Sequence, residues 1–567
     1  MTQSADQLPN GRRPWWARLI PGLFFLSLAI LNTYPLAAAP GSFIGEHGDS
    51  YFSVWRLAWI AHQLWQRPGQ LFNGNIFYPE KATLAYSDAI LLPAIVVSPL
   101  HWLGVDPIVA YNLVLIAAFT LNGVAAYSLV RYLTGSMAAG LLGGAIFAFS
   151  PHRFDHFDHL EMQFAFWIPW AVLAWHKAIG RDEVRGYLRV AALVSAQVLS
   201  CIYYGVFLIT WLGVLAAFNF WRTPSRIVRA GALMLVPALL VLAVYSIPYL
   251  QNRQKVGDRR SRDVQVYSAT FSDFLSAPST NQLYGWSYSL GSPERHLFPG
   301  LVTVGLLVVG LWPPISRTVV LHLVGLIVAL ELTFGFNAHV YKILYDWVLP
   351  FRGLRVPARA YVLVLLGVAV IAGVGFSRLI ASLRSVTRAP RVWGAAIPAI
   401  VLAVVVAEYF TMPRLRDVDR DVPIWYSWLK QQDDAVIFEW PVTVPWRLYD
   451  MVDLNYMARS TLHWRPMLNG YSGYYPESYL RLLVDMRSFP DTKSLNVLRD
   501  RGATILVLHE YAETRIRYAR AVERLMRDPL VQPIAQDRDG RGRVAFFRLL
   551  PKPKPVSSET AQQRDRR

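Results

Sequence analysis

The chain has 567 residues, of which 54% are hydrophobic and only 17% are charged, and its mean hydropathy is +0.29. Soluble domains carry about 25% charged residues, so this composition indicates a membrane protein with several spans. The roughly ten-residue alternation of a membrane barrel is not seen, so the spans must be helices. Much of the net charge of +18 lies in short loops between apolar segments, which is typical of cytoplasmic loops and not of a nucleic-acid groove.

The first apolar segment follows three arginines and resembles a secretory signal. Its apolar stretch, 19–39, is longer than usual for such a signal. We therefore expect a retained first helix behind a cytoplasmic tail over 1–17. Cys201 is the only cysteine, which excludes an intrachain disulfide and a cysteine-based metal site.

Apolar windows of roughly 20 residues predict about 11 spans, with the N-terminus in the cytoplasm. The predicted spans are 18–38, 107–131, 136–151, 160–179, 187–200, 204–221, 230–250, 299–313, 317–335, 356–379 and 393–411. With this orientation the arginines of the short loops fall on the cytoplasmic side. The assignment requires 89–104, which contains two prolines, to be an interfacial or re-entrant helix and not a span.

The long loops then lie on the outer side of the membrane, beginning with the first outer loop, 39–106, and the second, 151–159. The fold class is therefore an α-helical polytopic membrane protein, with a transmembrane domain over 18–411. A small α/β extracytoplasmic domain is expected over 412–550, followed by a basic disordered tail over 551–567.

Local patterns predict the elements of the C-terminal domain. Short runs rich in apolar and β-branched residues predict strands at 436–440 and 503–509. Helical periodicity is found at 476–486 and 513–526, and the glycines near Gly540 indicate a terminal hairpin.

The segment 151–161 packs seven ionisable residues between two apolar segments. Charges at membrane depth cost roughly 2.5 kcal/mol or more each, so they need a reason to be there. If the segment is helical, one face carries His152, Asp155, His156 and His159. Asp155, Asp158 and His156 could then bind a divalent cation such as Mg or Mn, or the histidines could move protons near neutral pH. A titratable rim without a ligand is the alternative.

The first outer loop opens with a second acidic motif, Gly45-Glu46-His47-Gly48-Asp49-Ser50-Tyr51. Its glycines allow a close turn that presents Glu46 and Asp49 at the membrane rim. Tyr51 and His159 are expected to contact substrate there. The alternative is a solvated turn in which Asp49 or Ser50 caps the following helix.

Arginines on the outer side run against the positive-inside bias. Four of them are candidate ligands for a lipid phosphate, namely Arg259, Arg352, Arg355 and Arg359. Pairing with headgroups or with Asp258 and Asp263 is the alternative. In the C-terminal domain, the segment 463–475 combines aromatics, an amide and glycines, so Trp464 and Asn469 are candidates for binding a sugar ring.

These motifs together resemble the GT-C superfamily of integral membrane glycosyltransferases that use polyprenyl-phosphate sugars, in an uncharacterised bacterial subfamily. The resemblance rests on Gly48-Asp49 in the first outer loop, Asp155 and Asp158 after the third span, and the outer arginines. It implies that Asp49, or secondarily Glu46, is the general base, and that Asp155 and Asp158 hold a metal or orient the donor phosphate. The chain departs from the pattern because three histidines surround these acids and the first loop lacks an adjacent Asp-Glu pair.

The sequence thus predicts a glycosyltransferase of the bacterial inner membrane, moving a hexosyl or pentosyl group from a polyprenyl-phosphate carrier to a glycan, lipid or protein acceptor outside the cytoplasm. No nucleic-acid partner is expected. One alternative is a transporter or flippase of lipid-linked sugars, whose sign would be acids within the spans, chiefly Glu331 and Glu408. Another is a membrane-anchored protein of envelope assembly.

Overall fold

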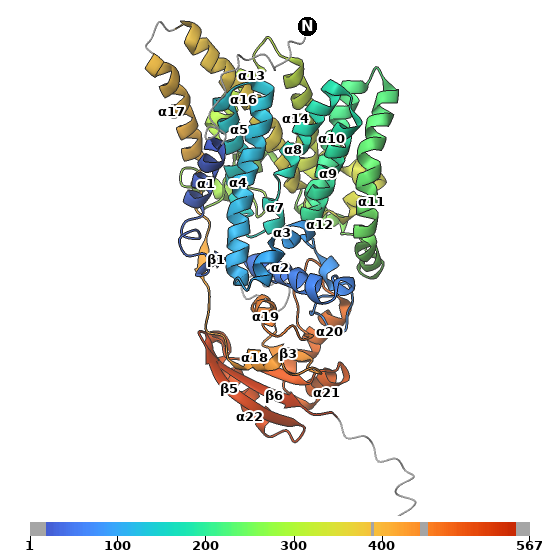
Figure 1. The fold of residues 1–567 in the computed structure, drawn as a ribbon. Coiled ribbons are helices and arrows are strands. Elements are labelled where there is room, and N and C mark those ends of the chain that lie inside the picture. Colours follow the sequence, from blue (N-terminus) through green and yellow to red (C-terminus); the bar gives the residue numbers. More distant parts are fainter. Residues whose placement is uncertain (1–18, 387–390, 443–451, 552–567) are drawn as a thin grey trace, which may run out of the picture. The chain divides into compact units, whose positions relative to one another are not determined.

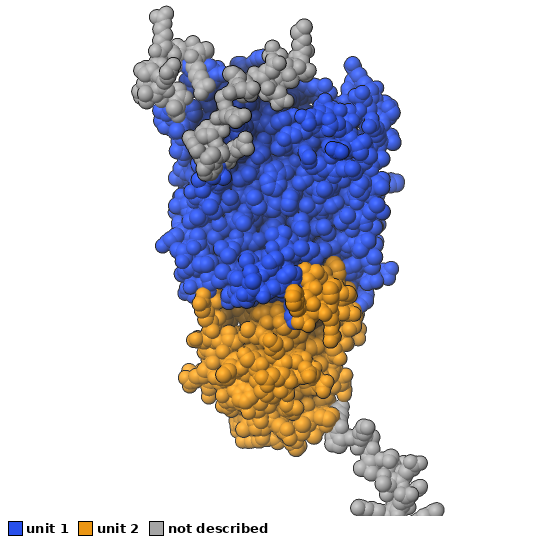
Figure 2. Space-filling model, in the orientation of Figure 1, with its two compact units in different colours: residues 1–62, 88–417 blue, residues 63–87, 418–567 orange. Residues whose placement is uncertain are grey.

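The computed structural model describes residues 19–386, 391–442 and 452–551. Two units are distinguished along the chain (Figures 1 and 2). Unit 1 comprises 1–62 and 88–417, and unit 2 comprises 63–87 and 418–567. Residues 63–87 therefore belong with the C-terminal segment, although nothing in their composition separates them from the rest of the first outer loop. The predicted tails at 1–17 and beyond residue 551 lie outside the described residues.

A helix lies in each of the windows predicted to span. These helices are α1 (Ile20–Asn32), α4 (Pro107–Thr134), α5 (Met137–Phe149), α8 (Trp167–Arg181), α9 (Val184–Ser200), α10 (Ile202–Phe220), α11 (Pro224–Val256), α13 (Leu301–Leu311), α14 (Arg317–Phe334), α16 (Tyr361–Val386) and α17 (Arg391–Tyr409). Within the described residues, five helical segments are long and apolar enough to cross a membrane, namely Pro107–Thr134, Ile202–Phe220, Pro224–Val256, Arg317–Asn337 and Pro357–Leu383. The number of 11 spans stays a prediction.

Helix α11 has the surface that a lipid-facing helix needs. Only 17% of its most apolar window is buried. Large aliphatic side chains such as Leu239, Leu240 and Val244 are exposed along it. Such a continuous apolar surface is stable next to hydrocarbon and not next to water.

Helix α3 (Leu91–Trp102) occupies the window that was expected not to span. Its 12 residues rise by about 18 Å, which is less than the roughly 30 Å of hydrocarbon in a bilayer. This length agrees with an interfacial or re-entrant helix.

Helix α16 lies at the centre of the packing of unit 1, and 89% of its most apolar window is buried. Glycines permit its close contacts. A Cβ on Gly310 of α13 would overlap the carbonyl oxygen of Ile371, and a Cβ on Gly375 would overlap that of Leu306. Small residues are the usual means of close helix packing in membranes.

The connections of unit 1 form short elements. They are β1 (Phe43–Gly45), α2 (Asp49–Gln66), α6 (Pro151–Asp155), α7 (Leu160–Gln163), α12 (Ser261–Val266), α15 (Val340–Trp347) and β2 (Leu415–Asp417). Strands β1 and β2 pair antiparallel, with Ile44 opposite Arg416. This pairing joins the start of the first outer loop to the end of unit 1.

Unit 2 contains a four-stranded sheet in the order β3-β4-β6-β5. The strands are β3 (Ile437–Trp440), β4 (Ile505–His509), β5 (Val531–Asp539) and β6 (Gly542–Leu549). The helices are α18 (Trp425–Leu429), α19 (Val452–Ser460), α20 (Glu477–Asp485), α21 (Thr492–Asp500) and α22 (Arg515–Met526). Strands β3 and β4 are parallel, and the other pairs are antiparallel. The predicted strands, both predicted helices and the terminal hairpin are thus present.

Asn469 holds two elements of unit 2 together. Its Oδ1 accepts a hydrogen bond of 2.7 Å from the backbone of Glu439 in β3, and its Nδ2 donates to the Glu439 carbonyl at 3.0 Å. Nδ2 also donates to Asp453 of α19 at 2.9 Å. The side chain is fully buried, so this amide serves the fold of unit 2.

We expect Asn469→Ala to destabilise unit 2. Three hydrogen bonds are lost, and the buried backbone N–H and carbonyl of Glu439 lose the Asn469 side chain as their partner, at a cost of about 2–4 kcal/mol. Pulse proteolysis against temperature, on the purified full-length protein, should show cleavage of unit 2 beginning several degrees lower. Asn455→Ala is the control, because its side chain accepts one exposed bond from Arg541 within the described part of the chain. Equal profiles for the two variants would contradict this role.

Candidate functional site

Asp49 lies at the start of α2, directly after the turn that follows β1. Its Oδ2 is 3.2 Å from Nδ1 of His47 and 3.2 Å from Nε2 of His159. The first turn of a helix favours a negative charge. The side chain is 14% exposed, so it is largely buried but retains some contact with solvent.

The charged forms of Asp49, His47 and His159 stabilise one another. Burial raises the pKa of Asp49, but hydrogen bonds from His159 and His47 and the charges of both rings hold it well below its usual value. Burial lowers the pKa of His159, but the hydrogen bond and charge of Asp49 outweigh it, so this pKa is raised. The pKa of His47 is also raised, chiefly by its hydrogen bond to Asp49. Asp49 is therefore ionised at neutral pH.

Glu46 has a different setting from Asp49. Its side chain is exposed, and its nearest cationic partner, Arg414, is 3.9 Å away. Of the two acids in the motif 45–51, Asp49 is the one that the structure surrounds with titratable side chains.

Asp158 lies beside the same turn. Its Oδ1 accepts a hydrogen bond of 2.6 Å from Ser50, whose hydroxyl is 3.0 Å from that of Tyr111. Burial raises the pKa of Asp158 to about 6. A Cβ on Gly45 would overlap both Asp158 and Ser50, so only glycine allows this approach.

The segment 151–161 does not form the single helix that its spacing suggested. Helix α6 ends at Asp155 and α7 begins at Leu160. Gln163 explains the break, because its Nε2 donates to the carbonyls of Arg153 and His156, which a continuous helix would use itself. The predicted face therefore divides, although the rings of successive histidines stay close, at centroid distances of 4.6 Å (152 to 156) and 5.6 Å (156 to 159).

An ion pair that the sequence did not predict joins α2 to α7. Arg56 of α2 donates to Glu161 at 2.8 Å and to the carbonyl of Asp88 at 2.6 Å. The Arg56 side chain is 1% exposed. Glu161 was part of the charged segment, but nothing in the sequence around Arg56 distinguishes it from an ordinary arginine on an amphipathic helix.

A second buried ion pair lies close to His156 and His159. Arg359 contacts Oε2 of Glu294 through Nε at 3.0 Å and through a terminal nitrogen at 2.8 Å. Burial raises the pKa of Glu294, but Arg359 and then His159 and His156 lower it to about 2. Glu294 was not predicted as a site residue. Its backbone φ of +66° is in the left-handed region, which is rare for a residue with a side chain.

The other residues predicted to bind the donor phosphate or the substrate lie in different surroundings. The guanidinium of Arg355 lies over the Tyr267 ring at 5.2 Å. Arg352 donates to the carbonyls of Tyr345 and Asp346, and its own carbonyl accepts from the backbone of Arg259. The ring of Tyr51 lies beneath Arg416 at 4.6 Å. Trp464 and Asn469 belong to unit 2.

The structure does not assemble the three predicted metal ligands. Asp155 contacts Nδ1 of His296 at 2.9 Å, and Asp158 is held by Ser50. The ring nitrogens of His156 are buried and have no hydrogen-bond partner. Among the described residues, no group of three or more His, Cys, Asp or Glu side chains is arranged to hold a metal ion.

Two proteins of known structure are similar to this chain. The oligosaccharyltransferase of Archaeoglobus fulgidus in the apo form is 11% identical, with a TM-score of 0.49, over 89% of this chain and 70% of that one. ArnT from Cupriavidus metallidurans in the apo state is 12% identical, with a TM-score of 0.47, over 94% of this chain and 97% of that one. ArnT bound to undecaprenyl phosphate gives the same identity and TM-score. These values are too low to transfer an activity or a residue's role.

Sequence comparison gives a firmer result. No curated protein matches the chain. The family model described as "Domain of unknown function (DUF6311)" matches residues 20–349. This match covers more than half of the 567 residues, and the chain therefore belongs to the DUF6311 family.

Proposed function

We propose that the protein is an integral membrane glycosyltransferase of the bacterial inner membrane. In this proposal it transfers a sugar from a polyprenyl-phosphate carrier to an acceptor on the extracytoplasmic side. The observation that carries the proposal is the ionised, partly exposed Asp49 between His47 and His159 in an apolar helical unit. Charges are kept in such surroundings mainly where they serve a site.

The proposed chemistry needs one proton acceptor and one stabilised leaving group. The acceptor oxygen forms a bond to the anomeric carbon, and the bond from that carbon to the phosphate oxygen breaks, with its electron pair leaving on the phosphate. Asp49 takes the hydroxyl proton. Because its pKa is depressed, the transfer is favourable only late, when bond formation has made the hydroxyl acidic. His159 holds the carboxylate in place.

Arg355 is a better candidate than Arg352 or Arg359 for binding the leaving phosphate. Arg359 is already neutralised by Glu294, and Arg352 donates to backbone carbonyls. Arg355 makes no ion pair within the described part of the chain, yet its charge is close enough to lower the pKa of Glu294. A guanidinium in this state can bind phosphate oxygens with two parallel hydrogen bonds.

The acids in the predicted spans favour a transferase over a transporter. Glu331 accepts hydrogen bonds from the backbone of His339 and Val340 at the start of α15. Glu408 accepts from the backbone amides of residues 301 and 302 at the start of α13. Both carboxylates thus satisfy helix N-termini, which is a structural task.

Replacing Asp49 should remove most of the activity. General bases contribute roughly 10²- to 10⁴-fold, so we expect Asp49→Asn to lower kcat by about 10³ with lipid-linked sugar in membranes. Asp155→Asn should lower kcat less, because the proposed proton transfer does not use this carboxylate, which contacts Nδ1 of His296. The control is Asp106→Asn, since Asp106 caps α4 and asparagine caps equally well. Full activity in both the Asp49 and the Asp155 variants would end the proposal for these sites.

The role of Arg355 predicts a graded response. Arg355→Gln should lower kcat/KM for the lipid donor by about 100-fold, as expected for loss of a group that stabilises developing charge. The kcat/KM of Arg355→Lys should lie between those of Arg355→Gln and the unmodified protein, because lysine keeps the charge but lacks the planar guanidinium. Arg226→Gln removes an equal charge from α11 and should match the unmodified protein. Identical kinetics for the glutamine variants at 355 and 226 would exclude this role.

The ion pair of Asp49 and His159 predicts a pH-dependent stability. The folded pKa of His159 is raised above 6.5, so its contribution is complete below the unfolded pKa and is lost as pH rises through the folded pKa. The thermal midpoint of the unmodified protein should exceed that of Asp49→Asn, and this difference should be larger near pH 6 than near pH 9. In a His159→Gln background this change with pH should shrink. A difference independent of pH would show that the two side chains are not electrostatically coupled.

A further inference from the structure

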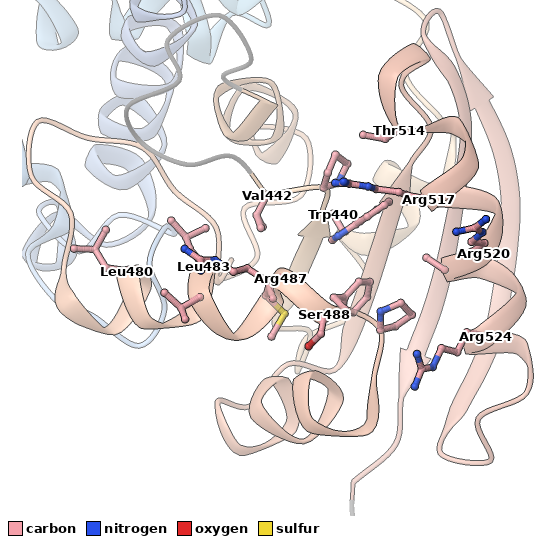
Figure 3. A pocket seen from close by; sticks show the side chains of 16 residues that line it. Trp440, Val442, Leu480, Leu483, Arg487, Ser488, Thr514, Arg517, Arg520 and Arg524 are labelled. Atoms are coloured by element: carbon pink, nitrogen blue, oxygen red, sulfur yellow. The ribbon is translucent and has the colours of Figure 1, made fainter.

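Unit 2 contains a cavity of about 690 Å³, apart from the candidate active site. Helix α22 lines one side of it (Figure 3). Helix α20 and the turn that follows line the other side, and Trp440 lies between them (Figure 3). Cavities of roughly 300–1,000 Å³ are typical of small-molecule sites.

Four arginines line this cavity. Arg517, Arg520 and Arg524 come from α22, and Arg487 comes from the opposite side (Figure 3). The three on α22 are spaced by three and four residues, which places them on one face of the helix. They reach along about 10 Å of its axis.

These arginines are not neutralised by neighbours. Among the residues that the structure describes, none of the four donates a side-chain hydrogen bond or forms an ion pair. Two arginines that do not line the cavity are paired, Arg515 with Glu510 at 3.3 Å and Arg527 with Glu523 at 2.5 Å. Arg524 is close enough to lower the pKa of Asp491, but that carboxylate caps α21 by accepting from the backbone of Ser494.

Apart from Arg487 and Ser488, the side chains on the opposite side are apolar. Leu480, Leu483 and Val484 of α20 line the cavity, and Val484 is 56% exposed. The rings of Trp440 and Phe489 pack at a centroid distance of 5.9 Å and close the base. The arginines of α22 thus face the aliphatic side chains of α20 across one cavity, and of these Val484 is exposed.

We propose that this cavity binds a single anionic lipid that carries a phosphate headgroup. The phosphate contacts the guanidinium groups, which suit its oxygens bidentately, and the first methylenes of the chains cover the aliphatic side chains of α20. An acidic peptide would engage the arginines but leave that wall in water. Helices of the same chain are long and apolar enough to cross a membrane. The site does not depend on the proposed transferase activity.

The test uses the full-length protein in a neutral detergent and short-chain phosphatidic acid as the probe. We expect phosphatidic acid to bind more tightly than phosphatidylcholine with the same chains. Replacing two arginines together, Arg520→Gln and Arg524→Gln, should raise the Kd for phosphatidic acid at least about tenfold, because hydrogen bonds to charged groups are lost. Arg527→Gln removes a nearby charge outside the cavity and should change Kd less than about twofold. Thermal midpoints of all variants show whether they fold.

Further outcomes distinguish a bound lipid from a free phosphate compound and from an acidic peptide. Glycerol 3-phosphate has the headgroup without the chains, and competition as strong as that of phosphatidic acid would overturn the lipid proposal. An Asp-rich peptide that binds this cavity more tightly than the lipid would also overturn it. Val484→Asn should weaken phosphatidic acid without changing glycerol 3-phosphate binding. An unchanged Kd for phosphatidic acid in the folded double-arginine variant would place its binding elsewhere on the chain.

Discussion

The buried ion pair between Arg56 and Glu161 fixes the geometry of the candidate site. Arg56 lies two turns after Asp49 on α2, and Glu161 lies two residues after His159. The pair therefore sets the position of the carboxylate against the imidazole. Removing one partner of a buried pair typically costs about 3–5 kcal/mol, because the other charge is left uncompensated. Unit 1 can hold several charges in apolar surroundings because nearly every one has an opposite charge or a backbone dipole against it.

Local patterns predicted much of the fold. Apolar windows located the long helices, short apolar runs located strands β3 and β4, and glycines located the terminal hairpin. These features depend on residues close in the chain, where periodicity is informative. The break between α6 and α7 was missed because Gln163 takes up carbonyls of the preceding turn. The grouping of 63–87 with unit 2 was missed because it depends on contacts with residues far along the chain.

The candidate site could be predicted only in part, for the same reason. Asp49 and the 151–161 segment were identifiable because acids and histidines are rare between apolar segments. Their partners were not, since Asp155 contacts His296 and Arg359 contacts Glu294 across long stretches of sequence. Residue type alone also suggested that Asn469 binds sugar, whereas its amide is engaged with Glu439 and Asp453. Only tertiary structure separates a buried amide that supports the fold from one that faces a ligand.

The left-handed backbone of Glu294 has a consequence for engineering this protein. A side chain in that conformation costs on the order of 1–3 kcal/mol, and glycine would relieve the cost. Glycine would also leave the guanidinium of Arg359 without its carboxylate partner. A substitution chosen only for backbone conformational preference would thus discard an electrostatic contact beside His156 and His159. Thermostability and the charge balance of the site make opposite demands at this position, and a selection for heat resistance should monitor both.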